Sequence, residues 1–352
     1  MHLGIPALLE FWSRHREEDS LVLATIIGAR GSTYRKPGAM MLISRDGMFE
    51  GLISGGCLEG DLLEHAAGVF ESGEPAFVTY DMSAGDDLIW NLGIGCDGVI
   101  HLMLQRLDRE NGLDLFRQVA ASHGARKAVL MALVIRAGDG LPAGGTALRD
   151  QSGLCRGPAA LLPLLEEVSE DWPDWRCQDF ELDGARVMLV NMPPRTRVLV
   201  CGAGPDAVPV ADAFSRLGWE VLVADHRSAF ARSDRFTPGC QVMHLRPAEL
   251  GEKVDLQEID AAVIMTHHLE SDAEYLRQLC DTHIEYLGLL GPTARKGRLR
   301  EMAACGRRSL YGPVGLDIGA ELPSSIALSI AAEVHAVLNG RDGHPLAGPD
   351  HD

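Results

Sequence analysis

The residues best suited to chemistry gather in residues 28–64, which read GARGSTYRKPGAMMLISRDGMFEGLISGGCLEGDLLE. Two cations, Arg30 and Arg35, lie in its first glycine-containing loop, and Cys57 follows Gly55-Gly56 where a helix is predicted to begin. Glycine lets the backbone come close to a ligand. A helix N-terminus attracts anions and lowers the pKa of a thiol. The stretch is therefore predicted to hold an anionic group beside a sulfur atom.

Cys57 has three roles that the sequence leaves open. Its thiolate could ligate a metal or carry a transferable sulfur, or the residue could be a small buried side chain at a tight turn. Glu59 lies two residues further on and would disfavour a thiolate if its carboxylate lies close. A second glycine-flanked turn, LGIGCDGV, carries Cys96. Two such turns in one domain favour a functional role over a purely structural one.

A dinucleotide-type turn occurs at residues 198–207, which read VLVCGAGPDA. This G-x-G-x-x-A pattern stands between a predicted strand and a predicted helix, and Asp225 follows Gly202 by 23 residues. In that context Gly202 would make the turn, Gly204 would admit a pyrophosphate, and Asp225 would reach a ribose hydroxyl. Pro205 removes one backbone N–H from the turn. A nucleotide site and a Rossmann fold that has lost its nucleotide are supported about equally.

Two histidines follow the predicted strand at 261–266. Ligands of open α/β sheets bind at the carboxyl ends of the strands. His267 is therefore a candidate base or anion contact, whereas His268 is better explained as a cap of the next helix.

The elements that must position these residues fall into two domains. Residues 1–190 mix predicted helices and strands, with a hairpin at Asp46-Gly47. Tandem prolines mark a linker at 191–196. Strands and helices alternate strictly over 197–340, which predicts a Rossmann-like, doubly wound parallel sheet, and 341–352 form a tail. The predicted fold class is α/β, an N-terminal α/β module followed by a Rossmann-like domain.

Composition limits the possible partners. The chain of 352 residues has 32 basic and 50 acidic residues, a net charge of −18, which argues against nucleic acid or an anionic membrane surface as a partner. The sequence has no predicted signal peptide and no stretch of about 20 apolar residues that could span a membrane. The eight scattered cysteines include no CxxC pair, so they are predicted to be reduced thiols in a cytoplasmic protein.

Taken together, these motifs resemble the XdhC/CoxI family, whose members mature molybdenum hydroxylases such as xanthine dehydrogenase. The resemblance spans most of the chain, except residues 105–190, and rests on seven stretches in the family's order: GARGSTYRKPGAMML (28–42), LISGGCLEGDL (52–62), LGIGCDGVI (92–100), VLVCGAGPDA (198–207), MTHHLESDAEYL (265–276), GLLGPTARKGRL (288–299) and GPVGLDIGAELPSSIALSIAAEV (312–334).

The resemblance implies an accessory protein, or chaperone, without turnover chemistry. It would bind the molybdopterin form of the molybdenum cofactor while a cysteine desulfurase adds the terminal sulfur, and then deliver it to an apo molybdenum hydroxylase. A homodimer is implied as well. Carried onto this chain, the cofactor-binding residues are Arg30, Ser32, Thr33, Arg35, Gly55, Gly56, Cys57, Glu59, Cys96, Gly202, Gly204, Asp225, His267 and Asp317, with Cys57 as the metal ligand.

Two other classes of function compete with this one. An NAD(P)-dependent oxidoreductase would use the Gly202 turn, and NAD(P) or another nucleotide is a possible second cofactor. The sequence offers no hydride-accepting site beyond His267. An interaction scaffold would use the glycine loops only as structure. Which hydroxylase is the client, and whether the cofactor is the plain or the cytidine dinucleotide form, stay open.

Overall fold

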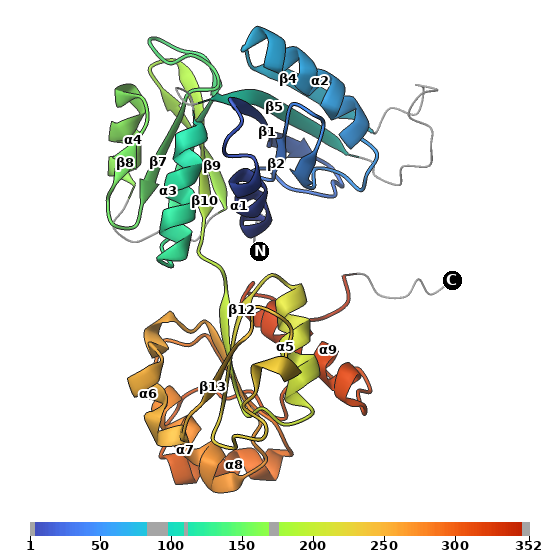
Figure 1. Ribbon diagram of the computed structural model, residues 1–352, viewed down its shortest axis with the longest axis vertical. Helices are drawn as coiled ribbons and strands as arrows, with labels where there is room; N and C mark the ends of the chain where they lie inside the picture. Colours follow the sequence, from blue (N-terminus) through green and yellow to red (C-terminus); the bar gives the residue numbers. More distant parts are fainter. Residues whose placement is uncertain (1–3, 83–97, 109–111, 169–175, 347–352) are drawn as a thin grey trace. The chain divides into compact units, whose positions relative to one another are not determined.

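The computed structural model describes residues 4–82, 98–108, 112–168 and 176–346. The chain divides into two compact units, Met1–Pro194 and Arg195–Asp352 (Figure 1). Within the described ranges, every helix is too short or too polar to cross a lipid bilayer. The cytoplasmic location stays a prediction from the sequence.

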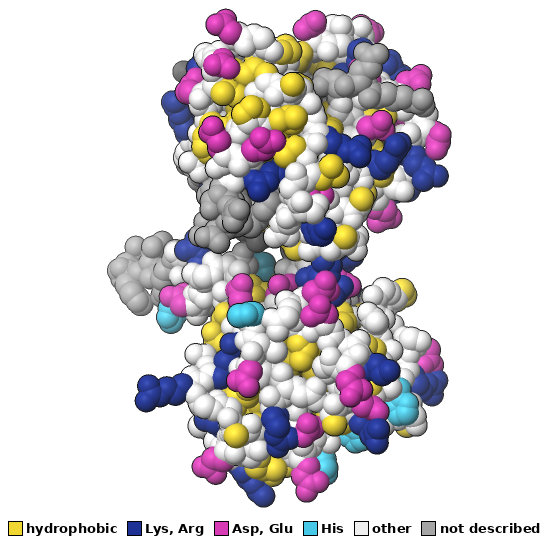
Figure 2. Space-filling model, turned by 90° about the vertical axis from the view of Figure 1, so that its left-hand side faces the viewer, with side chains coloured by type: hydrophobic (Ala, Val, Ile, Leu, Met, Phe, Trp, Pro, Cys, Tyr) yellow, Lys and Arg dark blue, Asp and Glu magenta, His cyan; other side chains and the backbone are white. Residues whose placement is uncertain are grey.

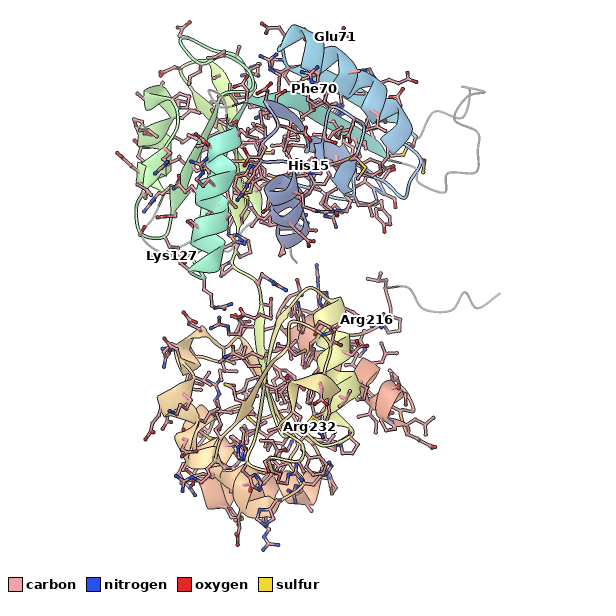
Figure 3. The ribbon with its side chains drawn as sticks, viewed as in Figure 1. His15, Phe70, Glu71, Lys127, Arg216 and Arg232 are labelled. Carbon is pink, nitrogen blue, oxygen red and sulfur yellow. A yellow bond between two sulfur atoms is a disulfide. The ribbon has the colours of Figure 1, made fainter. Side chains whose placement is uncertain are left out.

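The N-terminal unit contains a five-stranded antiparallel sheet, here called sheet A, with strand order β3-β2-β1-β5-β4. The strands are β1 (Ser20–Arg30), β2 (Met40–Ile43), β3 (Phe49–Gly51), β4 (Ala76–Asp81) and β5 (Val99–Asp108). The predicted hairpin at Asp46-Gly47 is confirmed, since it joins β2 to β3. Helix α2 (Glu59–Ser72) covers one face of the sheet and ends at Gly73, whose φ of 75° suits a glycine C-cap. Phe70 of α2, labelled in Figure 3, packs into the core between helix and sheet.

A second antiparallel sheet, sheet B, completes this unit, with strand order β8-β7-β6-β10-β9. Its strands are β6 (Val129–Arg136), β7 (Thr146–Asp150), β8 (Cys155–Arg156), β9 (Cys177–Leu182) and β10 (Ala185–Met192). Helices α1 (Ile5–Arg14) and α3 (Leu113–Gly124) share one core with the inner faces of both sheets. The outer face of sheet B packs against η1 (Ala159–Leu161) and α4 (Leu162–Glu167) (Figure 1).

The C-terminal unit is a parallel five-stranded sheet, which confirms the predicted Rossmann-like, doubly wound fold. Its strand order is β13-β12-β11-β14-β15. Helices α7 and α8 pack on one face and α5 and α9 on the other (Figure 1). The strands are β11 (Arg197–Cys201), β12 (Glu220–Asp225), β13 (Gln241–His244), β14 (Ala261–Ile264) and β15 (Tyr286–Leu289); the helices are α5 (Ala207–Arg216), η2 (Ser233–Arg235), η3 (Pro247–Glu249), α6 (Leu250–Lys253), η4 (Leu256–Glu258), α7 (Leu269–Leu279), α8 (Thr293–Ala303) and α9 (Pro323–Val337).

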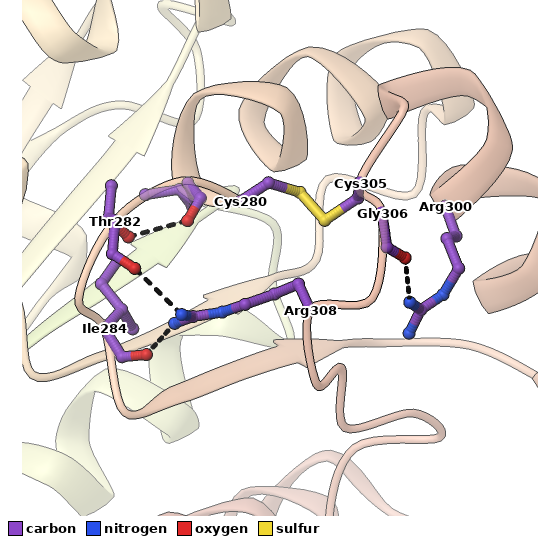
Figure 4. Close-up of a disulfide and its surroundings, with 8 residues drawn as sticks. Cys280, Thr282, Ile284, Arg300, Cys305, Gly306 and Arg308 are labelled. Carbon is purple, nitrogen blue, oxygen red and sulfur yellow. Dashed lines mark hydrogen bonds between the residues drawn. A yellow bond between two sulfur atoms is a disulfide. The ribbon is translucent and has the colours of Figure 1, made fainter.

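A disulfide joins Cys280, at the end of α7, to Cys305, just after α8 (Figure 4). The prediction that all eight cysteines are reduced thiols is therefore wrong for this pair. The folded chain places their Cα atoms 5.5 Å apart, within the range that a disulfide spans. The sequence gives no hint of this, because the two residues are 25 positions apart and in no motif.

Removing this disulfide is expected to destabilise the C-terminal unit. Closing a loop of 25 residues restricts the unfolded chain, and a loop of this size corresponds to about 3.5 kcal/mol in the chain-entropy model. Cys305→Ser should lower the free energy of unfolding in urea by about that amount, and dithiothreitol should destabilise the wild type but not the variant. Equal stability of the wild type with and without reductant would contradict the expectation.

Candidate functional site

Three glycine-rich segments leave sheet A at the same end. Strand β1 ends there at Arg30, paired with Val99 at the start of β5, and Asp81 at the end of β4 pairs with the same residue. On the other side of β1, Gly51 ends β3 opposite Met41 near the start of β2. The loop 31–39, the turn 52–58 and the segment before Val99 therefore all start from one end of the sheet. We call this the loop end of sheet A.

The loop that follows Arg30 is held by close packing against Gly98. A Cβ atom on Gly98 would lie 2.7 Å from Cγ2 of Thr33 and 2.8 Å from the carbonyl oxygen of Arg30, and it would also clash with the carbonyl oxygen of Ser32. Only glycine fits there, so the backbone at Gly98 packs tightly against this loop. Cys96 itself lies outside the described residues.

Arg30 and Arg35 present positive charge at this end. The Arg30 side chain is exposed and makes no ion pair or hydrogen bond with any described residue. The Nε atom of Arg35 is buried and has no hydrogen-bond partner in the described part of the chain. Its electrostatic neighbour is Arg176, whose pKa is lowered by burial and then by the charge of Arg35. A cation placed beside another cation, with a buried donor unsatisfied, favours the binding of an anion.

The turn that carries Cys57 is organised by Ser54 and Glu59. Oγ of Ser54 accepts hydrogen bonds from the backbone N–H groups of Gly56, Cys57 and Leu58 at 3.1–3.2 Å. Ser54 Oγ donates in turn to Glu59 Oε2 at 2.6 Å. The Glu59 carboxylate also accepts from the N–H groups of Ser54 at 3.0 Å and Leu58 at 3.1 Å. Together the two side chains bind the backbone N–H groups of the turn that leads into α2, including that of the N-cap residue Leu58.

Glu59 is buried, and burial raises its pKa, but the hydrogen bonds from Ser54 and Leu58 outweigh this and hold the pKa below its ordinary value. The negative charge of Glu59 therefore stabilises the turn. The N–H groups of Gly56 and Cys57 point to Ser54 rather than outward. The Cys57 side chain is exposed, which argues against the structural explanation of a buried residue at a tight turn. Ser54 was not among the predicted site residues, because it stands five residues before Glu59 and the pair does not have the spacing of a capping box.

A hollow of about 460 Å³ adjoins the loop end of sheet A. It lies on the side of the sheet away from α2, over the ends of β1, β4 and β5. Its lining includes Gly28, Arg30, Phe77, Thr79, His101 and Arg186. Only Arg30 among them was a predicted site residue. Phe77, Thr79, His101 and Arg186 lie in no motif, so nothing in the sequence alone marks them.

In the C-terminal unit, the Gly202 turn is closed by the unit's own side chains. Asp225 is fully buried and accepts from the Ala203 N–H at 2.7 Å. It also accepts from the backbone and the guanidinium of Arg227 at 2.6–2.9 Å. Burial raises the pKa of Asp225, yet these bonds outweigh it and keep the pKa low. The carboxylate predicted to reach a ribose is therefore already satisfied within the unit.

Asp206 lies over the second glycine of this turn. A Cβ atom on Gly204 would be 2.6 Å from Asp206 Oδ1, so a carboxylate occupies the approach predicted for a pyrophosphate. Asp206 Oδ2 is also 2.7 Å from Nε2 of His267, whose φ of 64° is unusual for a residue other than glycine. His268 caps α7 by accepting from the Ser271 N–H at 3.3 Å, as predicted.

The predicted site residues thus fall into separate groups. Those of the N-terminal unit that the structure describes lie in or next to the loops at the loop end of sheet A. Gly202, Gly204, Asp225 and His267 meet at the carboxyl ends of β11, β12 and β14 in the other unit. Asp317 belongs to neither group, because it is exposed on the loop before α9. Figure 2 shows Lys and Arg side chains interspersed with Asp and Glu on the face that it presents.

Comparisons with known proteins agree with this organisation. Residues 15–81 match the model of the XdhC and CoxI family, and residues 198–334 match the XdhC Rossmann domain. A Bacillus subtilis protein described as a probable xanthine dehydrogenase subunit is 32% identical over 95% of this chain and 96% of its own length. The molybdenum cofactor insertion chaperone PaoD of Escherichia coli is 25% identical over 90% of this chain and 83% of its own length. A crystal structure described as a xanthine dehydrogenase from Bacillus halodurans superposes with a TM-score of 0.80, at 30% identity, over 99% of this chain and 98% of that one.

Proposed function

The chain belongs to the XdhC and CoxI family, and from this premise we propose that it binds the molybdenum cofactor and delivers it to an apo molybdenum hydroxylase. An accessory role in the maturation of such enzymes is what its relatives support, since one of them is a molybdenum cofactor insertion chaperone. The cofactor is cargo here, and the chain carries out no turnover reaction of its own. The observation that carries the proposal is the loop end of sheet A, where Arg30 and Arg35 lack an acidic partner among the described residues.

The chemistry of the cargo fits this end of the sheet. Molybdopterin carries a phosphate and binds molybdenum through a dithiolene, so it is strongly anionic. Arginine guanidinium groups form charge-assisted hydrogen bonds with such groups. The exposed Cys57 thiol supplies a soft ligand for molybdenum or a carrier for the transferable sulfur. Its turn is held by Ser54 and Glu59, so the thiol is presented from a fixed backbone.

Partners follow from this role and are part of the proposal. An apo hydroxylase must receive the cofactor, and a cysteine desulfurase must supply the terminal sulfur while the cofactor is held. We also propose that the chain acts as a homodimer, as the family resemblance implies.

The competing hypothesis of an NAD(P)-dependent oxidoreductase is not favoured. The Asp225 carboxylate already accepts hydrogen bonds from Ala203 and Arg227, and Asp206 places a second carboxylate beside Gly204. A pyrophosphate would meet negative charge there instead of free N–H groups. Any nucleotide in this unit, including the cytidine part of a dinucleotide cofactor, would need contacts other than those of the usual fingerprint.

Substitutions at the loop end should weaken cofactor binding without unfolding the chain. Loss of one charge-assisted contact in Arg35→Ala should raise the Kd for isolated molybdenum cofactor about tenfold, and Cys57→Ser should weaken it if the thiol touches molybdenum. The shift in Tm on adding cofactor measures this. Arg117→Ala is the matched control, because Arg117 is an exposed arginine of the same unit, paired with Asp114 on α3. A cofactor-induced Tm shift that is unchanged in both loop variants would contradict the proposal.

A further inference from the structure

The hollow beside the loop end of sheet A is built by an interruption in strand β1. The pairing of β1 with β5 shifts between Ile26 and Gly28, which is a β-bulge at Ile27. Bulges re-aim side chains and are frequent next to functional sites. Beyond this bulge Gly28 pairs with His101, and His101 pairs with Thr79 of β4. Neighbours directly across strands point to the same face, so these positions form one patch.

The floor of the hollow is open because of glycine. A Cβ atom on Gly28 would lie 3.2 Å from Cδ2 of His101, so any side chain there would enter the space above the histidine ring. Gly28 is not in the left-handed region, and its backbone therefore does not itself require glycine. The missing side chain at position 28 therefore leaves the hollow open, and the backbone conformation does not require it. Further along the same face of sheet A, Met103 packs into the core that this sheet shares with sheet B. The hollow begins where sheet B no longer covers this face.

The walls combine an apolar face with polar groups. Phe77 of edge strand β4 is 52% exposed, which is unusual for a phenylalanine and leaves its ring free to stack on a ligand. Nδ1 of His101 is 2.9 Å from Oγ1 of Thr79, whereas Nε2 of the same ring has no hydrogen bond to a described residue and can bind a ligand. Arg30 lines the hollow, and its guanidinium has no partner among the described residues, whereas Arg186 is held by Asp179 through Nε at 3.0 Å.

We propose that this hollow binds the pterin ring system of the cofactor, with Arg30 between the ring and the anionic part at the loop end. The proposal rests on the proposed function and names the subsite for the heterocycle. The volume of about 460 Å³ lies within the range of small-ligand sites. A flat heterocycle with hydrogen-bonding edges matches one exposed aromatic ring, one histidine nitrogen and one arginine. Phe77 stacks on the ring, while His101 and Arg30 bind its polar edge.

A fluorescence titration with 6-hydroxymethylpterin tests the subsite, because this probe has the ring without phosphate or metal. The wild type should bind it. Gly28→Val, which fills the hollow with a residue that suits a strand, should weaken binding at least tenfold, and Phe77→Ala should weaken it about tenfold. The matched control is Phe49→Ala, at the opposite edge strand of sheet A, where a 41% exposed phenylalanine should be neutral. Inorganic phosphate should not compete. His101→Ala provides a second variant if Gly28→Val proves unstable by thermal unfolding.

Isolated molybdenum cofactor and adenosine monophosphate are titrated in parallel. Cofactor binding without any binding of the free pterin, or with unchanged affinity in Gly28→Val and His101→Ala, would overturn the subsite and leave the proposed function standing. Tighter binding of adenosine monophosphate than of the pterin would also overturn it. A wild type that binds neither the cofactor nor the pterin would overturn both proposals.

Discussion

Replacing Asp225 with alanine is expected to lower the free energy of unfolding of the C-terminal unit by about 3 kcal/mol, at the low end for breaking a buried ion pair. Asp225 is fully buried, and its carboxylate accepts from Ala203 and from the side chain of Arg227. The substitution leaves the Ala203 N–H and the guanidinium without their partner. The low end applies because the Arg227 side chain is 34% exposed and can be partly solvated.

Urea unfolding measures this loss, and an exposed ion pair of the same unit provides the control. Asp234→Ala removes the partner of Arg232, where both side chains are more than half exposed (Figure 3), so its effect should stay below about 0.5 kcal/mol. Because Asp225 is bound internally, saturating NAD+ or NADP+ should not stabilise the wild type. A Tm that rises with either nucleotide in the wild type but not in Asp225→Ala would contradict this assignment.

Glu59→Ala is the second large expected effect, again about 3 kcal/mol of unfolding free energy. The carboxylate accepts three hydrogen bonds, two from backbone N–H groups and one from Ser54 Oγ. Hydrogen bonds to a charged group contribute about 1.5–3 kcal/mol, and donors left buried without a partner add a desolvation cost. Glu64→Ala is the matched control, since Glu64 is exposed on the same helix and no change is expected there.

The pH dependence follows from the lowered pKa of Glu59. A carboxyl group whose folded-state pKa is depressed stabilises the fold above the unfolded pKa of about 4.3, and loses this contribution as the pH falls through the folded value. The difference in stability between wild type and Glu59→Ala should therefore be full at pH 7 and should shrink below about pH 4. A difference that persists undiminished at pH 3 would show that Glu59 acts by packing rather than by charge.

The same variant links stability to function. Ser54 and Glu59 hold the N–H groups of Gly56, Cys57 and Leu58, so without the carboxylate the thiol is no longer presented from a fixed turn. Glu59→Ala should therefore retain less molybdenum cofactor than Glu64→Ala at a temperature where both variants are folded.

The sequence predicted what depends on local pattern. Strict strand–helix alternation after residue 197 predicted the parallel sheet, and Asp46-Gly47 predicted its hairpin, since both rest on short-range periodicity and turn chemistry. Strand β13 (Gln241–His244) was missed. It is a four-residue strand without a buried side chain, and it lies at the edge of the described sheet, paired with β12.

The site was predictable only in part for a physical reason. Arg30, Arg35 and Cys57 stand in glycine-rich motifs, where residue type and spacing carry information. Phe77 and His101 are ordinary strand residues, and only the pairing of β4, β5 and β1 brings them to Gly28. The sequence also could not show that Asp225 binds a residue of its own unit. Its partner Arg227 is a residue type that would equally suit a nucleotide phosphate.

The most direct test of cofactor binding is to count molybdenum and pterin per chain in protein purified from a molybdenum-replete host. Metal analysis and mass spectrometry of the intact ligand give both numbers for the wild type and for the double variant Arg30→Ala/Arg35→Ala. We expect the wild type to carry molybdenum and pterin in equal amounts and the folded double variant to carry only background. A wild type free of both, or a double variant that carries as much as the wild type, would contradict the account.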